Sequence, residues 1–562
     1  MTDEQPQSTK RSRRGWWLFA VITLILLVLL PPFLNINRFR RRIAASISGS
    51  LGRPVHFDSV GFRILPTPGF TLENFVVGEN PAFGDEPFLL ANTVTATLHI
   101  SSLWRGHLEF ATISLDEPHV NLVRNAEGKW NVESILLQAS QIHTAPTAQS
   151  SAGDLPRFPY IEATQARVNI KMGEEKMPFS LTDAKLALWL SQPETWHVRM
   201  EARPLRTDMN ANDTGLAQVE GTFQRAATLD AIPLELSARW RDAQLGDVSH
   251  ILMGENAGWR GSIDTQANVT GHFGDAQIDA RMNLDEVRRA EFEPDHALSL
   301  HVACTANALD NLRSFDAIHC TLPVGDGSVL MEGKIANLRE SPQPALRFTA
   351  QQVPAAQLLE IARHATNRIA PELTAAGAAD GTFSYGPPAA PADKKPHALP
   401  SNTKPVWQGS ITLPTLTLAV PGIPGSLTIT DLHLHTADEA ATGKSHAHAF
   451  TGAVFDPVTL ALGGSAPATL DGSLHHDSYT LHLRGSVIEP QLLALAHALP
   501  QIGDGIENAL PATTPTAPPL PIFIDATAQR TWSGLGMYAG SSLLNQSSGL
   551  WTSATQRKPR GR

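Results

Sequence analysis

Alternation of apolar and polar residues is the dominant pattern along this chain. Side chains at every second position of a β-strand point to the same face, so such alternation predicts strands with one apolar face. Glycine and proline, 41 of each, interrupt these runs about every eight to twelve residues, which favours many short strands over long helices. The predicted fold class is therefore mainly β with a few short helices. The clearest alternating sets are Val94, Ala96, Leu98 and Ile100; Val168, Ile170 and Met172; and Leu186, Leu188 and Leu190.

A longer repeat also runs through the sequence. Short helical patterns occur at residues 245–252, 355–363 and 490–499, each after an alternating strand. Glycine-flanked strands at 261–271 and 377–386 follow the first two. A repeat of this kind predicts stacked β-units that share one apolar surface, although chance similarity between β-rich segments is the alternative. Strands bent around that surface would form an elongated, repetitive and open β-sheet groove.

An uncharged run lies near the N-terminus. Residues 16–34 (WWLFAVITLILLVLLPPFL) contain 19 residues without a charge. A helix of this length, at about 1.5 Å per residue, crosses a hydrocarbon core about 30 Å thick. The run therefore predicts a single transmembrane anchor, and a cleaved signal peptide is the alternative because a basic leader precedes it. The predicted anchor residues are Trp16, Trp17, Leu24, Leu30 and Leu34.

The direction of this anchor is not decided by charge, because four basic residues precede the run and four follow it closely. The short leader, residues 1–15, favours a cytoplasmic N-terminus with the rest of the chain exported. Just after the anchor, Phe39, Ile43, Ile47 and Leu51 fall on one face of a helix. Such a face, with arginines on the other side, is predicted to lie along the lipid headgroups.

Composition narrows the partners and the domain organisation. A net charge of −10 with only 17% charged residues provides no large basic surface, so no nucleic-acid partner is expected. Proline- and alanine-rich stretches at 138–156, 387–405 and 511–521 are typical of linkers. The predicted regions are a cytoplasmic leader at 1–15, an anchor at 16–34, an N-terminal β region at 35–140, a central β-repeat region at 157–386, a C-terminal β region at 406–534 and a disordered tail at 535–562.

The chemistry of enzymes is missing from the sequence. No GxSxG, Walker-type loop, HExxH, GxGxxG or CxxC occurs in a context that supports catalysis, so we predict no enzyme, no catalytic residue and no cofactor. His433 and His435, with His446 and His448 nearby, suggest a metal site, because an H-x-H pair on a strand points both imidazoles to one face. No complete ligand set is recognisable around them. The polar face of an amphipathic strand is the simpler interpretation, and no metal is predicted.

The two cysteines lie in strand-like runs on either side of a loop. Cys304 and Cys320 are equally far from Leu312, so a hairpin would place them opposite each other. In an oxidising compartment a disulfide closing this loop would stabilise the fold by about 3 kcal/mol. Two buried thiols are the equally open alternative.

The segment after the anchor carries a pattern of known type. GRPV at 52–55 follows the amphipathic helix, and PGFTLEN at 68–74 follows in a hairpin. This part of the chain resembles the N-terminal region of the AsmA family of bacterial envelope proteins. A second matching run, W-x-G-x-L through G-x-W-N, consists of Trp104, Gly106, Leu108, Ile113, Leu115, Pro118, Val120, Leu122, Arg124, Gly128, Trp130 and Asn131.

The resemblance implies a protein of the bacterial inner membrane with its bulk in the periplasm, concerned with outer-membrane biogenesis. For the wider family it implies carriage of phospholipid along a β-groove, with outer-membrane assembly components as possible partners, and it carries over no catalytic residue. The alternative is a scaffold or chaperone-like factor for outer-membrane protein assembly. In the groove interpretation Asn169 and Lys171 face away from the lipid. The candidate groove-lining residues are Val94, Leu98, Ile100, Val168, Ile170 and Met172.

Overall fold

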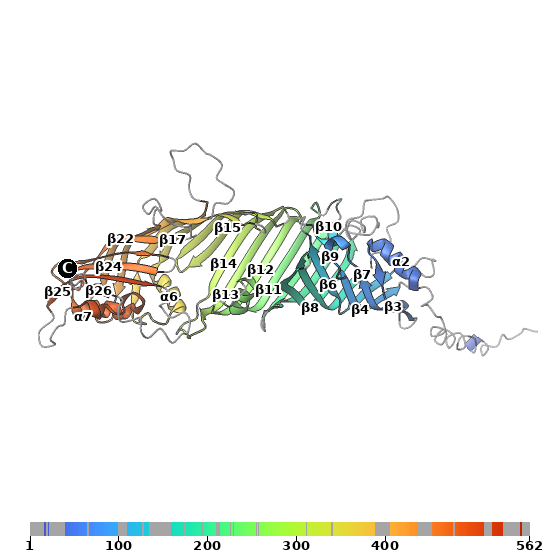
Figure 1. Cartoon of the computed structure of the whole chain (residues 1–562), viewed down its shortest axis with the longest axis horizontal. Coiled ribbons are helices and arrows are strands. Elements are labelled where there is room, and N and C mark those ends of the chain that lie inside the picture. The colour runs from blue at the N-terminus through green and yellow to red at the C-terminus, as the bar shows by residue number, and fades with distance from the viewer. Residues whose placement is uncertain are drawn as a thin grey trace, which may run out of the picture. The chain divides into compact units, whose positions relative to one another are not determined.

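A computed structural model gives the architecture of the chain, and strands dominate it, with a few short helices (Figure 1). This confirms the mainly β fold class. The described residues fall into two compact units. Unit 1 comprises Met1–Ala243 with Val269–Phe273, and unit 2 comprises Gln244–Asn268 with Gly274–Arg562. The structure describes residues 16–17, 19, 21, 40–63, 67–98, 110–125, 129–133, 159–173, 175–192, 195–208, 214–224, 226, 228, 230–253, 256, 258–310, 312–338, 341–387, 405–436, 452–475, 478–510, 520–531 and 551–553.

Unit 1 forms one sheet of mostly antiparallel strands. β1 and β2 each pair with β3, and the sheet continues through β4, β5 and β6. The longer β7 pairs in parallel with both β5 and β6, and β8 to β11 follow as antiparallel neighbours. The elements are α2 (Arg40–Leu51), β1 (Val55–His56), β2 (Ser59–Arg63), β3 (Gly69–Val77), η3 (Pro81–Phe83), β4 (Leu89–Leu98), β5 (Phe110–Asp116), β6 (His119–Arg124), β7 (Tyr160–Met172), β8 (Glu175–Gln192), β9 (Thr195–Arg206), β10 (Leu216–Gln224) and β11 (Pro233–Gln244).

Unit 2 contains a second run of antiparallel neighbours from β13 to β26, in which β17 pairs with β19 and β20 pairs with both β18 and β19. The three helical patterns of the sequence are confirmed as α5, α6 and α7. The elements are α5 (Leu245–Met253), β12 (Trp259–His272), β13 (Ala276–Arg289), β14 (Leu300–Leu309), β15 (Ser314–Val324), β16 (Gly327–Ala336), β17 (Gln343–Pro354), α6 (Ala355–Ala365), β18 (Thr374–Ala376), β19 (Ala378–Gly386), β20 (Val406–Ala419), β21 (Leu427–Thr436), β22 (Ala453–Leu460), β23 (Ala468–Leu474), β24 (Ser478–Ile488), α7 (Glu489–Ala498), α8 (Pro500–Gly503), η5 (Ile506–Ala509), β25 (Pro521–Thr531) and β26 (Trp551–Ser553).

Many of the long strands contain a β-bulge. Gln165, Asp183, Ala317 and Gln352 have positive φ angles of 54°, 50°, 48° and 50°. Each lies where the pairing register shifts, for example between Ala163 and Ala166 in β7. A bulge inserts one extra residue and increases the local twist of the strand. Residues three apart across a bulge can therefore share a face, which strict period-two alternation does not predict.

Helix α2 uses its apolar face within the protein. Ile43, Ile47 and Leu51 pack against the buried side chains of Val55 and Phe57. The prediction that this face lies along lipid headgroups is therefore wrong for these three residues, because their own sheet covers them. Arg41 and Arg42 remain exposed on the other side of the helix.

The sequence motifs that carry the family resemblance meet in a buried polar network. Arg53 of GRPV forms an ion pair with Glu79 and donates to the backbone oxygen of Asn131 at 3.0 Å. The Asn131 side chain donates to Glu79 at 2.5 Å and to the Asn121 carbonyl at 2.8 Å. Arg53 and Asn131 are both buried, and a buried charge is tolerated only when it is paired in this way. These motif residues therefore serve the fold.

The predicted anchor lies mostly outside the described residues, which include Trp16 and Trp17 as exposed helical residues but not Leu24, Leu30 or Leu34. No helix within the described part of the chain is long and apolar enough to cross a membrane. The leader at 1–15, the linker stretch at 138–156 and most of those at 387–405 and 511–521 also lie outside the described residues, so the predicted region boundaries stay predictions. Within the predicted tail, β26 pairs with β25.

Candidate functional site

In unit 1, an amphipathic sheet leaves part of its apolar face uncovered. Leu186, Met200, Val219 and Ala238 are register partners across β8, β9, β10 and β11, so their side chains share one face. We call this set the unit 1 apolar row. Leu186 is exposed and the other three are half-buried, unlike the residues of a closed core.

The opposite face of the same strands is charged. Lys185 pairs with Glu201 at 3.1 Å, and Arg199 pairs with Glu220 at 3.3 Å. The hydrogen bond from Lys185 holds the pKa of Glu201 below its usual value. The charged face is suited to contact with water. The opposite face, which carries the unit 1 apolar row, is suited to an apolar ligand.

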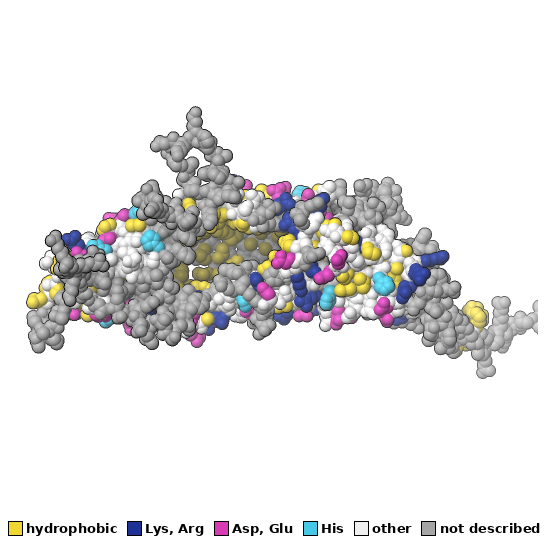
Figure 2. Space-filling model, viewed as in Figure 1, with side chains coloured by type: hydrophobic (Ala, Val, Ile, Leu, Met, Phe, Trp, Pro, Cys, Tyr) yellow, Lys and Arg dark blue, Asp and Glu magenta, His cyan; other side chains and the backbone are white. Residues whose placement is uncertain are grey.

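In unit 2, a longer set of register partners crosses the sheet from β13 to β20. We call this set the unit 2 apolar row. Its flanks alternate strictly: Ile278 and Met282 of β13 are half-buried, whereas Gln277 and Asn283 are exposed. Figure 2 shows a hollow lined by hydrophobic side chains at the position that β14 and β15 occupy in Figure 1. The row consists of Ala280, Cys304, Cys320, Met331, Phe348, Phe383 and Gly409.

Aromatic rings and a glycine end this row. The Trp407 ring contacts Phe348, with centroids 5.3 Å apart, and Tyr385 at 4.9 Å. Gly409 has a φ of +151° and lies so close to β19 that a Cβ atom would come within 2.1 Å of the Thr382 carbonyl oxygen. Only glycine fits there, which allows β19 and β20 to pair tightly beneath the rings.

The two cysteines belong to the unit 2 apolar row. The predicted hairpin is confirmed, because Cys304 and Cys320 are direct register partners on β14 and β15. The structure joins them in a disulfide, with Cα atoms 4.0 Å apart. The bridge fixes the register of two neighbouring strands and adds sulfur atoms, which have no hydrogen to donate, to the apolar face.

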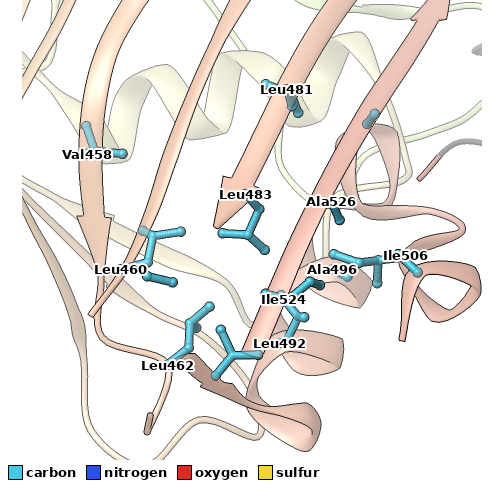
Figure 3. Packing of buried hydrophobic residues seen from close by; sticks show 14 of the residues in the cluster. Val458, Leu460, Leu462, Leu481, Leu483, Leu492, Ala496, Ile506, Ile524 and Ala526 are labelled. Atoms are coloured by element: carbon cyan, nitrogen blue, oxygen red, sulfur yellow. The ribbon is translucent and has the colours of Figure 1, made fainter. Parts of the chain in front are cut away.

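At the C-terminal strands of unit 2 the same kind of face is closed. Leu460, Leu483 and Ile524 come from strands, and Leu492 and Ile506 from the helical segment that covers them (Figure 3). We call this cluster the α7 core. It surrounds a cavity of about 120 Å³ lined only by apolar side chains and a glycine.

The local sequence explains why α7 forms over these strands. Pro490 lies in the first turn, where its missing N–H is not needed, and Glu489 complements the helix dipole there. His497 in the last turn lies 3.2 Å from Glu507. Leu492 and Ala496 are four residues apart and both buried, so one side of the helix faces the strands.

The structure separates the candidate groove-lining residues into different environments. Val94 and Leu98 are buried, and Val94 packs in the cluster beneath α2. Val168 and Ile170 are half-buried, as an open face requires, and Met172 is 41% exposed. Ile100 lies outside the described residues.

The side of β7 on which Asn169 and Lys171 lie, opposite Val168 and Ile170, is covered and not open to solvent. Lys171 is only 5% exposed and pairs with Glu86, and Asn169 hydrogen-bonds Asn121 at 3.1 Å and Ser180 at 3.0 Å. The segment that contains Glu86 covers this side of β7. The alternation of residues within β7 could not predict this covering segment, because Glu86 is far from Lys171 in the sequence.

Sequence reasoning also missed a charged contact on the outer face of unit 2. His482 of β24 lies 3.2 Å from Asp471 of β23 and 3.0 Å from Asp525 of β25. The hydrogen bond with Asp525 raises the pKa of His482 above its ordinary value, with a contribution from Asp471 and against partial burial. When protonated, this imidazole joins three neighbouring strands.

The comparisons with known proteins bear on the N-terminal part of the chain. The model of the AsmA family matches residues 10–176. This match confirms the resemblance to that family over the region that contains α2, the buried Arg53 network and β1 to β7. No curated protein and no solved structure matched the chain.

Proposed function

We propose that this chain is a non-enzymatic lipid-binding protein of the bacterial envelope. The proposal takes residues 10–176 as an AsmA-family N-terminal region. The unit 2 apolar row carries this proposal. Its side chains form a face from β13 to β20 that remains partly open to solvent. Exposed apolar surface costs about 25 cal/mol for each Å², so such a face gains free energy when an apolar ligand covers it.

Acyl chains match this face better than polar ligands do. Met331, Phe348 and Phe383 offer no hydrogen-bonding group, and the disulfide of the row has no hydrogen to donate. A sugar, nucleotide or peptide backbone bound here would lose its hydrogen bonds to water without replacement, at a cost of several kcal/mol. Phospholipid is therefore the proposed ligand, and an elongated groove built from such faces is the proposed path.

The proposed location follows from the family and the N-terminal run. Residues 16–34 would anchor the chain in the inner membrane as a single pass, with the bulk in the periplasm. In that place the protein would contribute to outer-membrane biogenesis, beside outer-membrane assembly components. An oxidising periplasm is also compatible with the bond between Cys304 and Cys320.

The second candidate function is a scaffold or chaperone-like factor for outer-membrane proteins. Leu520, just before β25, is 69% exposed, and Phe523, within β25, is 67% exposed. Phe523 lies on the face opposite the α7 core, since the neighbouring Ile524 is buried. Large exposed apolar side chains of this kind can bind unfolded polypeptide.

Native mass spectrometry of the full chain, extracted in detergent, separates the two functions. We expect bound phospholipid on the wild-type protein and a clear loss of it in Met282→Asp, because the new carboxylate lies on the apolar face. Asn283→Asp places the same group on the opposite, exposed face and should keep the full load. Bound polypeptide without lipid, or a full lipid load in folded Met282→Asp, would contradict lipid binding at this face.

A further inference from the structure

Two imidazoles and a carboxylate meet on the outer face of β21 and β22. His433 and His435 are two residues apart on β21, so both point to the side opposite Leu434. Asp456 lies on the neighbouring strand. Its Oδ2 atom is 2.9 Å from His433 Nδ1, and its Oδ1 atom is 4.0 Å from His435 Nδ1.

One of these nitrogen atoms lacks a hydrogen-bond partner within the described part of the chain. Nδ1 of His435 is shielded from solvent and has no partner at hydrogen-bond distance. The His433 and His435 rings stack with centroids 5.3 Å apart, which holds both nitrogen atoms on the side of Asp456. A shielded polar atom without a partner destabilises a fold unless a ligand satisfies it.

We propose that His433, His435 and Asp456 bind one divalent transition-metal ion, of the Zn²⁺ or Cu²⁺ class. The ligand atoms of all three side chains lie within 4.8 Å of one another. Tetrahedral Zn²⁺ with bonds of about 2.0–2.2 Å requires ligand atoms about 3.4 Å apart. The separations of 2.9 Å and 4.0 Å, each between one imidazole nitrogen and one Asp456 oxygen, lie on either side of that spacing, so side-chain rotation would be needed to bring the three ligand atoms to it. Water completes the coordination, because these side chains are 38–53% exposed.

The donor set selects the class of ion. Two imidazole nitrogens and one carboxylate oxygen suit Zn²⁺, Cu²⁺ and Ni²⁺, whereas Ca²⁺ and Mg²⁺ prefer oxygen ligands only. The sequence predicts no metal site, and the proposal differs from that prediction. Sequence alone contained the H-x-H pair, but it did not show that Asp456 lies beside it.

The position of the site gives the ion a structural role. The register pairs of β21 and β22 run from Leu434 to Thr436, so His433 and Asp456 lie at the end of the ladder. Pro457 follows Asp456 and has no N–H to extend the pairing. Asp431, two residues before His433 in β21, has a φ of +51°. A bound ion would join the two strands where their hydrogen bonds stop.

The test is metal titration of the full chain after chelation, with Zn²⁺ followed by calorimetry and Co²⁺ followed by visible absorption. We expect a single ion per chain. Changes in outer-shell partners alone weaken metal binding about 10–100-fold, so His435→Ala and Asp456→Asn should each weaken it by at least about 10-fold. At one Zn²⁺ concentration, the ion should also raise the Tm of the wild-type protein clearly more than the Tm of either variant. His301→Ala, on an exposed position of β14, is the matched control and should bind as the wild type does.

Further variants distinguish this site from other histidines. His482→Gln removes the imidazole between Asp471 and Asp525, and the pair His446→Ala with His448→Ala removes the two histidines that follow β21 in the sequence. Both changes should leave the titration intact. The proposal is overturned if the wild-type protein binds no ion, if folded His435→Ala binds normally, or if either of these other variants abolishes binding.

Discussion

Strands β13 to β17 and strands β22 to β25 of unit 2 share one pattern but bury it differently. In β13 the apolar positions, such as Ile278 and Met282, are half-buried. In β24 the equivalent positions, Leu481 and Leu483, are 4% and 2% exposed. The strands themselves do not explain this difference, since both alternate apolar and polar residues. The helical segment from α7 to η5 explains the burial in β22 to β25, because it packs over the apolar face of these strands. In the other group α6 contacts β13 and β17 but leaves Ile278 and Met282 half-buried.

The comparison shows that strands with the same alternating pattern can form either an open face or a closed core. Which of the two forms depends on whether a helical segment packs over the apolar side. A buried leucine of the α7 core contributes about 1.5–3 kcal/mol relative to an exposed one. The half-buried residues of the unit 2 apolar row gain only part of that amount within the protein. The remainder is available to a ligand, which is the physical basis of the proposed lipid binding.

The largest difference in the free energy of unfolding should appear when an aspartate is placed in the α7 core and on the apolar face of β13. Leu483→Asp would bury an unpaired carboxylate in the α7 core, at a cost of several kcal/mol that approaches the stability of a domain. Met282→Asp keeps access to water and should cost about 1 kcal/mol or less. Urea unfolding and limited proteolysis measure both. Equal destabilisation of the two variants would show that the β13 face is a closed core.

A smaller effect is expected from removing part of the cover. Leu492→Ala deletes a buried side chain of α7 and enlarges the adjoining cavity, which should destabilise the fold by about 2–5 kcal/mol. His497→Ala, on the exposed side of the same helix, loses a contact with Glu507 and should cost about 1 kcal/mol or less. Thermal unfolding of the two variants gives the comparison, and equal Tm values would argue against α7 as the cover.

Removal of the disulfide in the unit 2 apolar row should lower the stability by as much as Leu492→Ala or by less. Cys304 and Cys320 are separated by 16 residues, and closing a loop of this length stabilises a fold by about 3 kcal/mol in the chain-entropy model. Thiol labelling under denaturing, non-reducing conditions should find both cysteines blocked. Cys304→Ser with Cys320→Ser should lower the Tm. Two free thiols in protein taken from the envelope would contradict the bond.

The smallest effect should come from His482 on the outer face. Its pKa is raised in the folded state, so protonated His482 adds stability that is fully present below its ordinary pKa of about 6.5. This contribution is lost as the pH rises through the raised value. The group is partly exposed, so solvent screening keeps the effect small. Unfolding measured between pH 6 and pH 9 should show the loss in the wild type and a smaller loss in Asp525→Asn, in which only Asp471 still raises the pKa of His482.

Sequence could predict the elements but not their covers. The helical patterns gave α5, α6 and α7, and the cysteine spacing gave the β14–β15 hairpin, because both depend on local periodicity. The burial of Lys171 depends on Glu86, and the closed face of β24 depends on a helix folding back over it. Such contacts join segments whose proximity is set by tertiary packing. The bulge at Gln165 likewise has no period-two signal.

The central claim is that the unit 2 apolar row binds acyl chains, and site-specific photo-cross-linking tests it most directly. A photoreactive phenylalanine analogue would replace Phe348 in the row, Arg347 on the exposed opposite face, or Leu483 in the α7 core. In cells grown with labelled phospholipid precursor, we predict strong lipid cross-links at position 348 and background levels at position 347. Position 483 should give little, provided that the variant folds. Equal labelling at 347 and 348, or no labelling at 348, would contradict the account.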